Sequence, residues 1–152
     1  FNIINNHFDF YDINVLDLFA GTGNISYEFA ARGAKQILSV DNNFACIEYI
    51  KKTADKLNFA QIHTIRTDAF SYLASCKQSW DIIFADPYYD CEKFYEIPDL
   101  VFSNKLLVEY AWLVIEHSVK TSFSGHQNLF DQRKYGSVCF SFFKNKEEIE
   151  SE

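Results

Sequence analysis

Residues 15–24 read Val-Leu-Asp-Leu-Phe-Ala-Gly-Thr-Gly-Asn, so an apolar run leads directly into a glycine-rich turn. Two of the chain's five glycines, Gly21 and Gly23, lie in this turn. Glycine permits a tight reversal of the backbone, and it lets a ligand approach more closely than a residue with a Cβ would allow. The segment after the turn has apolar residues at helical spacing. The stretch therefore predicts a buried strand, a turn that accommodates a ligand, and a helix.

The same alternation of strand-like and helix-like segments continues along the chain. Apolar, β-rich runs predict strands at Asn14–Phe19, Gln36–Asp41, Gln61–Arg66, Asp81–Ala85, Ala111–His117 and Gly136–Lys144. Helical spacing predicts helices over Asn24–Arg32 and Phe44–Leu57. The apolar face of the second helix is expected to consist of Phe44, Ile47, Ile50 and Leu57. This alternation is typical of βαβ units, so we expect an α/β fold with a mostly parallel, doubly wound sheet and a C-terminal antiparallel strand.

Length and composition predict a single domain. The chain has 152 residues, with 14 Lys and Arg against 21 Asp and Glu, which gives a net charge of −7. We expect the domain to cover residues 1–144 and the charged residues 145–152 to form a solvated tail. No apolar run approaches the roughly 18 to 20 residues of a membrane span, so a soluble, cytoplasmic protein without a membrane partner is expected. The cysteines and histidines lack metal-ligand spacing, and we expect no metal and free thiols.

The acidic balance also bears on nucleic-acid binding. A pI near 5.0 gives no general attraction for a polyanion. The chain begins at Phe1 and contains no methionine, so we expect the complete protein to have residues ahead of Phe1. Basic contacts to a nucleic acid are therefore expected to be local, or to lie in that preceding segment.

Four aspartates stand at the carboxyl ends of successive predicted strands: Asp17, Asp41, Asp68 and Asp86. In a doubly wound sheet these ends border the crevice where ligands bind. Aspartate is also favoured as a helix cap or turn residue, so a structural role is the competing interpretation. A dinucleotide-binding fingerprint would require glycine at position 26, where this chain has Ser26. The pattern favours a ligand other than a dinucleotide.

These stretches resemble motifs I to IV of class I S-adenosylmethionine-dependent methyltransferases. The matching segments are Asp-Leu-Phe-Ala-Gly-Thr-Gly at 17–23, Ile-Leu-Ser-Val-Asp at 37–41, Asp-Ala-Phe at 68–70, and Asp-Pro-Tyr-Tyr at 86–89. Within that class the chain is most similar to bacterial enzymes that methylate the exocyclic N2 of a guanine in small-subunit ribosomal RNA, and the similarity extends to residues 112–117 and 133–136. The resemblance implies a Rossmann-like fold, S-adenosylmethionine as cofactor, and a monomer that acts on ribosomal RNA or the small subunit.

The resemblance also implies roles for individual residues. Asp17 would lie near the amino-acid end of the cofactor, Asp41 would accept hydrogen bonds from the ribose hydroxyls, and Asp68 would accept from the adenine amino group. The whole cofactor-binding set is expected to be Asp17, Phe19, Ala20, Gly21, Thr22, Gly23, Asp41, Asn42, Asp68, Ala69 and Phe70. S-adenosylmethionine has no phosphate, and its cationic ammonium and sulfonium groups are favoured near a carboxylate.

The resemblance places the chemistry in residues 86–89, with Asp86, Pro87 and Tyr89 as catalytic residues. The Asp86 carboxylate and the Pro87 carbonyl would accept the two hydrogens of an exocyclic amine, which is otherwise a poor nucleophile. Tyr89 has the position of the family's stacking aromatic. The family has a second proline where this chain has Tyr88, which leaves the turn less rigid. Expected substrate-binding residues are Tyr88, Tyr89, Arg133 and Lys134.

Alternatives remain at this point. Family members have a basic N-terminal hairpin ahead of a segment like Phe1-Asn2, and that hairpin is absent from this chain. An N6-adenine methyltransferase acting on RNA or DNA would present the same two acceptors to its substrate. A non-catalytic S-adenosylmethionine-binding module is favoured by Tyr88 and by the acidic balance. A dehydrogenase is disfavoured by Ser26 and by the lack of a convincing catalytic histidine or tyrosine–lysine pair.

Overall fold

Strand β1 (Asn14–Leu18) consists of the residues that lead into the glycine turn, and its last four residues are buried. The computed structural model describes residues 1–151, and the chain divides into two compact units, Phe1–Ala69 and Phe70–Glu152. Each unit has its own buried apolar core. The first contains the glycine turn, and the second contains the Asp-Pro-Tyr-Tyr segment.

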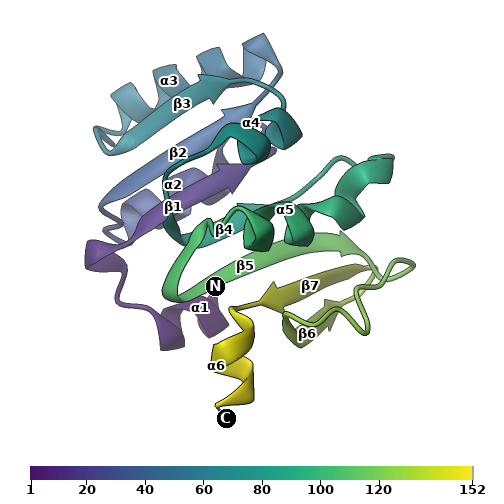
Figure 1. The fold of residues 1–152 in the computed structure, drawn as a ribbon. Helices are drawn as coiled ribbons and strands as arrows, with labels where there is room; N and C mark the ends of the chain where they lie inside the picture. The colour runs from purple at the N-terminus through teal and green to yellow at the C-terminus, as the bar shows by residue number, and fades with distance from the viewer. Residues whose placement is uncertain (152) are drawn as a thin grey trace. The chain divides into compact units, whose positions relative to one another are not determined.

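The first unit has three parallel strands in the order β3-β2-β1, with β2 at Gln36–Asp41 and β3 at Ile62–Arg66. Helix α2 (Asn24–Ala31) packs on β1 and β2, and α3 (Phe44–Lys56) packs on β2 and β3 (Figure 1). The short α1 (Asn2–His7) and a 3-10 turn at Phe10–Asp12 precede them. The predicted strands and both predicted helices of this unit are confirmed.

The apolar face predicted for α3 is only half correct. Ile47 and Ile50 are buried, but Phe44 is 59% exposed and Leu57 is 48% exposed. Phe44 is the first residue of the helix and lies under the Arg66 guanidinium, whose carbon is 5.5 Å from the ring centroid. Leu57 follows the last helical residue. The prediction was wrong for these two positions because both lie at helix ends, where helical spacing no longer determines burial.

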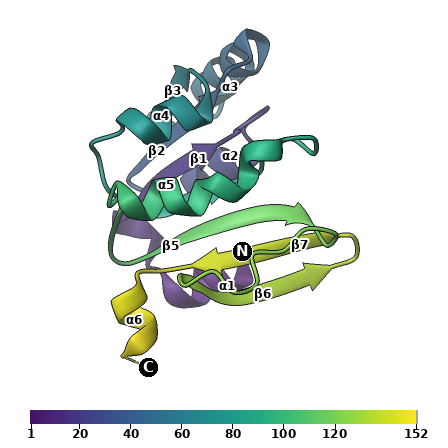
Figure 2. The same cartoon turned by 45° about the vertical axis from the view of Figure 1, so that its right-hand side comes forward.

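The second unit has four strands in the order β4-β5-β7-β6: β4 (Trp80–Ala85), β5 (Leu107–Ser118), β6 (Leu129–Tyr135) and β7 (Val138–Phe143). Strands β4 and β5 are parallel, whereas β7 pairs antiparallel with both β5 and β6. Figure 2 shows α5 (Ile97–Ser103) beside β5, and the hairpin of β6 and β7 below them. The unit also contains helix α4 (Ala69–Ser75) from its second residue on, a 3-10 turn at Glu92–Glu96, and α6 (Lys146–Glu150).

The C-terminal part has two features that the sequence did not predict. The predicted antiparallel strand is confirmed as β7, and β6 is a second one. Strand β6 was missed because its sequence Leu-Phe-Asp-Gln-Arg-Lys-Tyr is polar and lies half-exposed at the sheet edge without an alternating pattern. Part of the charged tail is the helix α6, in which the Glu148 carboxylate accepts a hydrogen bond from the Tyr110 backbone N–H at 2.6 Å. Over residues 1–151, no helix is both long enough and apolar enough to cross a membrane.

Candidate functional site

The glycine turn is attached to the end of β2 by two hydrogen bonds. The Gly21 N–H donates to Asp41 Oδ2 at 2.9 Å, and the Ala20 N–H donates to the Val40 carbonyl at 3.0 Å. Phe19, Gly21 and Gly23 all have positive φ, at 56°, 57° and 91°. Asp41 thus holds the backbone of the turn, a role that no sequence pattern predicts.

The two glycines of the turn differ in their surroundings. A Cβ on Gly23 would lie 2.8 Å from the Tyr27 ring and 2.9 Å from Ile50 Cγ1, so only glycine fits there. A Cβ on Gly21 would meet no atom within 4 Å. The surface above Gly21 is therefore open, and its bare backbone allows the close approach of a ligand that motif I requires. The turn fits the cofactor that the sequence predicts.

Asp17 lies beneath this turn and is 2% exposed. Ser26 Oγ donates to Asp17 Oδ2 at 2.6 Å, and Ser26 Oγ also lies 2.6 Å from Ser39 Oγ. Burial is the largest cause that raises the pKa of the Asp17 carboxyl from 3.8 to about 7; hydrogen bonds from the side chain and backbone of Ser26 oppose the rise, and the Asp41 charge adds to it. Ser26 therefore has a partner that the glycine of a dinucleotide fingerprint would not have.

The raised pKa of Asp17 predicts a pH dependence of stability. Because the folded protein binds this proton more tightly than the unfolded chain, the Asp17 contribution to the free energy of unfolding falls as pH rises from about 4 to about 7. A shift of this size corresponds to about 4 kcal/mol at most. We expect Asp17→Asn to remove this slope, so that it gains stability relative to the unsubstituted protein between pH 4 and pH 8. Urea unfolding of both proteins at several pH values between 4 and 8 measures the free energy of unfolding. The prediction is contradicted if this free energy has the same pH dependence in both proteins.

The remaining residues of the predicted cofactor set lie at the end of β2, after the end of β3, and at the start of α4. Asp41 Oδ1 accepts a hydrogen bond from the Asn43 N–H at 2.9 Å, so both carboxylate oxygens bind backbone. The Asn42 carbonyl accepts from Arg66 Nε at 3.2 Å. Asp68 is exposed and Ala69 is buried, both in the first unit. Phe70, which is half-buried, is the first residue of the second unit.

The Asp-Pro-Tyr-Tyr segment follows β4 and lines a cavity of about 430 Å³ in the second unit. Asp86 is exposed and Pro87 half-buried, while Tyr88 is 58% exposed and Tyr89 is fully exposed. The structure therefore brings all four predicted residues of this segment to one cavity. The other lining residues come from the turn after the segment, the end of β5, the following turn and the start of β7: Cys91, Phe94, Glu116, His117, Ser118, Lys120, Thr121, Ser137 and Val138.

His117 holds the strand end and the turn beside this cavity. Its Nε2 is 2.7 Å from Ser141 Oγ and its Nδ1 is 2.8 Å from Thr121 Oγ1. Burial lowers the pKa of the imidazole, which favours the neutral ring. The lining residues Glu116 and Lys120 were not predicted as site residues, because no motif or spacing marks them; only the pairing of β5 with β7 and the turn between β5 and β6 bring them to the cavity.

Arg133 and Lys134 are exposed on β6, and neither is among the residues that line the cavity. Arg133 Nε lies 3.1 Å from Asp131 Oδ2, an ion pair on the same strand. The hairpin that bears these cations contributes Ser137 and Val138 to the cavity instead. The structure thus places the two predicted cations on the same hairpin as part of the cavity lining, but not in the cavity.

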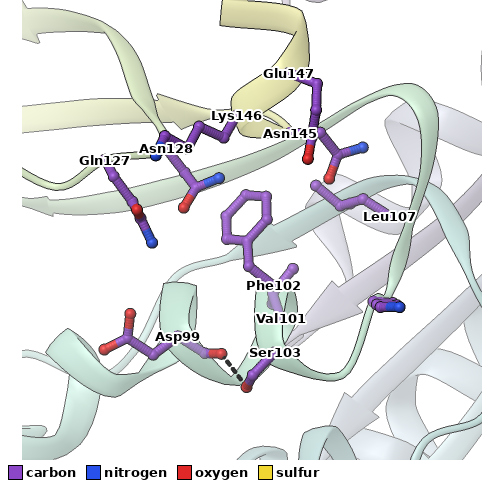
Figure 3. A pocket seen from close by; sticks show the side chains of 11 residues that line it. Asp99, Val101, Phe102, Ser103, Leu107, Gln127, Asn128, Asn145, Lys146 and Glu147 are labelled. Atoms are coloured by element: carbon purple, nitrogen blue, oxygen red, sulfur yellow. Dashed lines mark hydrogen bonds between the residues drawn. The ribbon is translucent and has the colours of Figure 1, made fainter.

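A second, larger cavity of about 590 Å³ lies at another place in the second unit. Figure 3 shows the Phe102 side chain between the α5 residues on one side and Asn128 and Asn145 on the other, with the bond from Ser103 Oγ to the Asp99 carbonyl drawn as a dashed line. None of the residues predicted for the site lines this cavity. A large volume alone does not indicate a function, so the smaller cavity, which contains the predicted residues 86–89, remains the candidate site.

Curated relatives of the chain are named as ribosomal RNA methyltransferases. YlbH of Bacillus subtilis, provisionally named as an rRNA methyltransferase, is 34% identical over 123 residues, which cover 77% of this chain and 65% of YlbH. Ribosomal RNA small subunit methyltransferase D of Buchnera aphidicola is 30% identical and matches 66% of this chain and 52% of its own. Ribosomal RNA large subunit methyltransferase K/L of Alteromonas mediterranea is 30% identical, over 84% of this chain and 16% of its own. The chain thus spans less than two-thirds of each of these relatives.

Solved structures with the same fold cover most of the chain. A conserved hypothetical protein of Streptococcus pyogenes has a TM-score of 0.85 at 22% identity, covering 95% of this chain and 92% of its own. The SAM-dependent methyltransferase of Agrobacterium tumefaciens has a TM-score of 0.69 at 20% identity, covering 88% and 56%. The Rossmann-like α/β fold expected from the sequence is therefore confirmed.

A protein-family model described as "Conserved hypothetical protein 95" matches residues 1–144. This match and the curated relatives confirm the resemblance that was drawn from the four sequence motifs. The chain therefore belongs to the family described as "Conserved hypothetical protein 95", among the class I S-adenosylmethionine-dependent methyltransferases.

Proposed function

We propose that this protein transfers a methyl group from S-adenosylmethionine to the exocyclic N2 of a guanine in small-subunit ribosomal RNA. The observation that carries the proposal is the cavity lined by Asp86, Pro87, Tyr88 and Tyr89, which gathers two hydrogen-bond acceptors and two exposed aromatic rings. The named relatives act on ribosomal RNA of the small and large subunits. The small-subunit guanine is proposed from the motif resemblance.

Residues of the first unit would hold the cofactor. S-adenosylmethionine supplies the methyl group, bonded to a positively charged sulfonium. The open backbone at Gly21 accommodates the close approach of the ligand, and Asp41 keeps the turn in this shape through the Gly21 N–H. Each oxygen of the Asp41 carboxylate accepts one backbone hydrogen bond and has a further lone pair for a ribose hydroxyl. The exposed Asp68 would accept from the adenine amino group, beside Ala69 and Phe70.

Residues of the second unit would hold the amine. The lone pair of an exocyclic amine is delocalised into the base, so the nitrogen must be held in a reactive geometry. The Asp86 carboxylate and the Pro87 carbonyl would each accept one amine hydrogen, which leaves the lone pair free for the methyl group, and the carboxylate can take the proton that the nitrogen loses. An aromatic ring stacked on the base contributes about 1 to 3 kcal/mol. Tyr89, fully exposed at the cavity, is proposed for this role.

The remaining expectations are part of the same proposal. Residues 1–144 would form the methyltransferase domain, and the protein would act as a monomer in the cytoplasm on ribosomal RNA or the small subunit. Arg133 and Lys134, on the hairpin that also lines the cavity, would contact RNA phosphates. An N6-adenine methyltransferase would use the same two acceptors, and it is distinguished by the methylated base.

The test uses the complete protein with its native N-terminus and labelled S-adenosylmethionine. It is offered small ribosomal subunits that lack the modification, with large subunits, naked RNA and DNA as controls. Label recovered as N2-methylguanine from the small-subunit RNA supports the proposal. Label in adenine, or only in large-subunit RNA, contradicts it, and cofactor binding without any transfer indicates a non-catalytic module.

A substitution at Asp41 tests the cofactor part separately. We expect Asp41→Ala to weaken S-adenosylhomocysteine binding about tenfold to a hundredfold, because it removes a hydrogen-bond acceptor of the ribose and the anchor of the Gly21 N–H. Titration calorimetry measures the affinity. Asp55→Ala, an exposed aspartate of α3, is the control. An unchanged affinity of Asp41→Ala would contradict the ribose contact.

A further inference from the structure

The cavity at residues 86–89 contains a carboxylate and an ammonium group that the proposed methyl transfer does not use. Glu116 is half-buried near the end of β5, and Lys120 is exposed in the turn that follows. Both line the same 430 Å³ cavity as Asp86 and Pro87. The cavity is also large enough for a purine base between its aromatic and polar walls.

Neither group is engaged elsewhere. Among residues 1–151, no hydrogen bond or ion pair to the Glu116 carboxylate or the Lys120 ammonium is found; the one Lys120 bond joins its backbone N–H to Ser118 Oγ at 3.1 Å. The Glu116 carboxylate is thus available to accept, and the Lys120 ammonium to donate, hydrogen bonds to a ligand in the cavity.

The four groups have the donor and acceptor types that the hydrogen-bonding edge of guanine requires. Along its Watson–Crick edge guanine presents the N2 amine as donor, N1–H as donor and O6 as acceptor. Asp86 and Pro87 are acceptors for N2, Glu116 is an acceptor for N1–H, and Lys120 is a donor for O6. Adenine has an unprotonated N1, which would bring a lone pair against the Glu116 carboxylate.

We propose that Glu116 and Lys120 select guanine over adenine by reading N1–H and O6 while residues 86–89 hold the amine. This inference rests on the proposed function and deepens it, because it names the residues that determine which base is accepted. A site built to hydrogen-bond a substrate N–H rejects an analogue that lacks it, since the partner in the site is left buried and unpaired.

The test is direct binding of four nine-nucleotide uridine RNAs, in the presence of S-adenosylhomocysteine, measured by fluorescence anisotropy. Their single central purine nucleotide carries guanine, adenine or 2-aminopurine, or is inosine. Inosine keeps N1–H and O6 but lacks the N2 amine, so it isolates the proposed contacts from Asp86. We expect the unsubstituted, complete protein to bind the guanine and inosine RNAs at least tenfold more tightly than the adenine RNA. In Glu116→Gln the ratio of inosine to adenine affinity should fall below about threefold, because an amide can accept from N1–H or donate to N1.

Lys120→Gln separates base reading from phosphate binding. If Lys120 reads O6, its replacement should weaken binding of the guanine and inosine RNAs and leave binding of the adenine and 2-aminopurine RNAs, which have no O6, unchanged. If Lys120 contacts a phosphate, its replacement should weaken binding of all four RNAs equally. Controls are Glu109→Gln and Lys77→Gln, which lie in the same unit outside the cavity lining.

Three results would overturn the inference: no binding of any of these RNAs, equal binding of all four by the unsubstituted protein, or a full inosine preference retained in Glu116→Gln. Methyl transfer to small subunits is measured in parallel. If base preference depends on Glu116 but no transfer occurs, the proposed function fails and the base-reading role stands. If guanine is methylated but base preference does not depend on Glu116, the proposed function stands and the base-reading role fails.

Discussion

Asp86→Ala is expected to reduce methyl transfer on the order of 10² to 10³-fold while leaving the affinity for S-adenosylhomocysteine unchanged. The carboxylate is an exposed acceptor at the cavity of the second unit, whereas the glycine turn proposed for the cofactor belongs to the first. Removing a group that stabilises only the reacting amine lowers the rate without lowering cofactor affinity. Single-turnover transfer of labelled methyl and titration calorimetry measure the two quantities.

Asp90→Ala is the matched control for this substitution. Asp90 is an exposed aspartate directly after the segment, and it is not among the residues that line the cavity. We expect it to retain transfer within about threefold, as is usual for a surface substitution away from a site. Equal losses of methyl transfer in both variants would indicate a general charge effect. Loss of cofactor affinity in Asp86→Ala would contradict the proposal that its carboxylate acts only on the amine.

Gly23→Ala is expected to destabilise the protein by about 3 kcal/mol, which combines the cost of a side chain at positive φ with overpacking against Tyr27 and Ile50. The new Cβ would lie 2.8 Å from the ring of Tyr27 and 2.9 Å from Ile50 Cγ1, both on helices that pack on the strands of the first unit. Urea unfolding without ligand measures the loss.

Gly21→Ala serves as the comparison because its φ is also positive but its Cβ meets no atom within 4 Å. It should destabilise the free protein by only about 1 kcal/mol, the cost of the backbone conformation. Its larger effect should be on cofactor binding, since the methyl group occupies the open surface of the turn. Equal destabilisation by the two substitutions would contradict the packing difference.

The parts of the candidate site that the sequence could locate are those formed by residues adjacent in the chain. The turn at residues 19–23 and the segment at 86–89 follow buried strands, so the local pattern was sufficient to locate both. The residues that complete them were not predicted. Ser26 reaches Asp17 from a helix, and Ser39 bonds Ser26 from the neighbouring strand. Glu116 reaches its cavity from a strand that pairs with β7. Such neighbours are defined by strand pairing and helix packing, which a single sequence does not reveal.

The missed strand β6 has a similar physical explanation. An edge strand exposed on one side needs no continuous apolar run, and its polar sequence is typical of edges that avoid pairing with other chains. The hairpin could be predicted only in part, because Val138, Phe140 and Phe142 alternate with polar residues on β7 alone. The pairing of Tyr135 with Val138 then defines the hairpin end.

The contact between the Tyr27 hydroxyl and the Thr22 carbonyl, at 2.7 Å, has a consequence for how a ligand is received. This hydrogen bond, the Gly21 bond to Asp41 and the Gly23 bond to Ala20 hold the backbone of the turn in place without a ligand. The loop therefore loses little conformational entropy when a ligand arrives, since its ordering has already occurred during folding. The turn is then a preorganised binding element. A substitution that removes the Tyr27 hydroxyl should therefore weaken ligand binding through the shape of the turn.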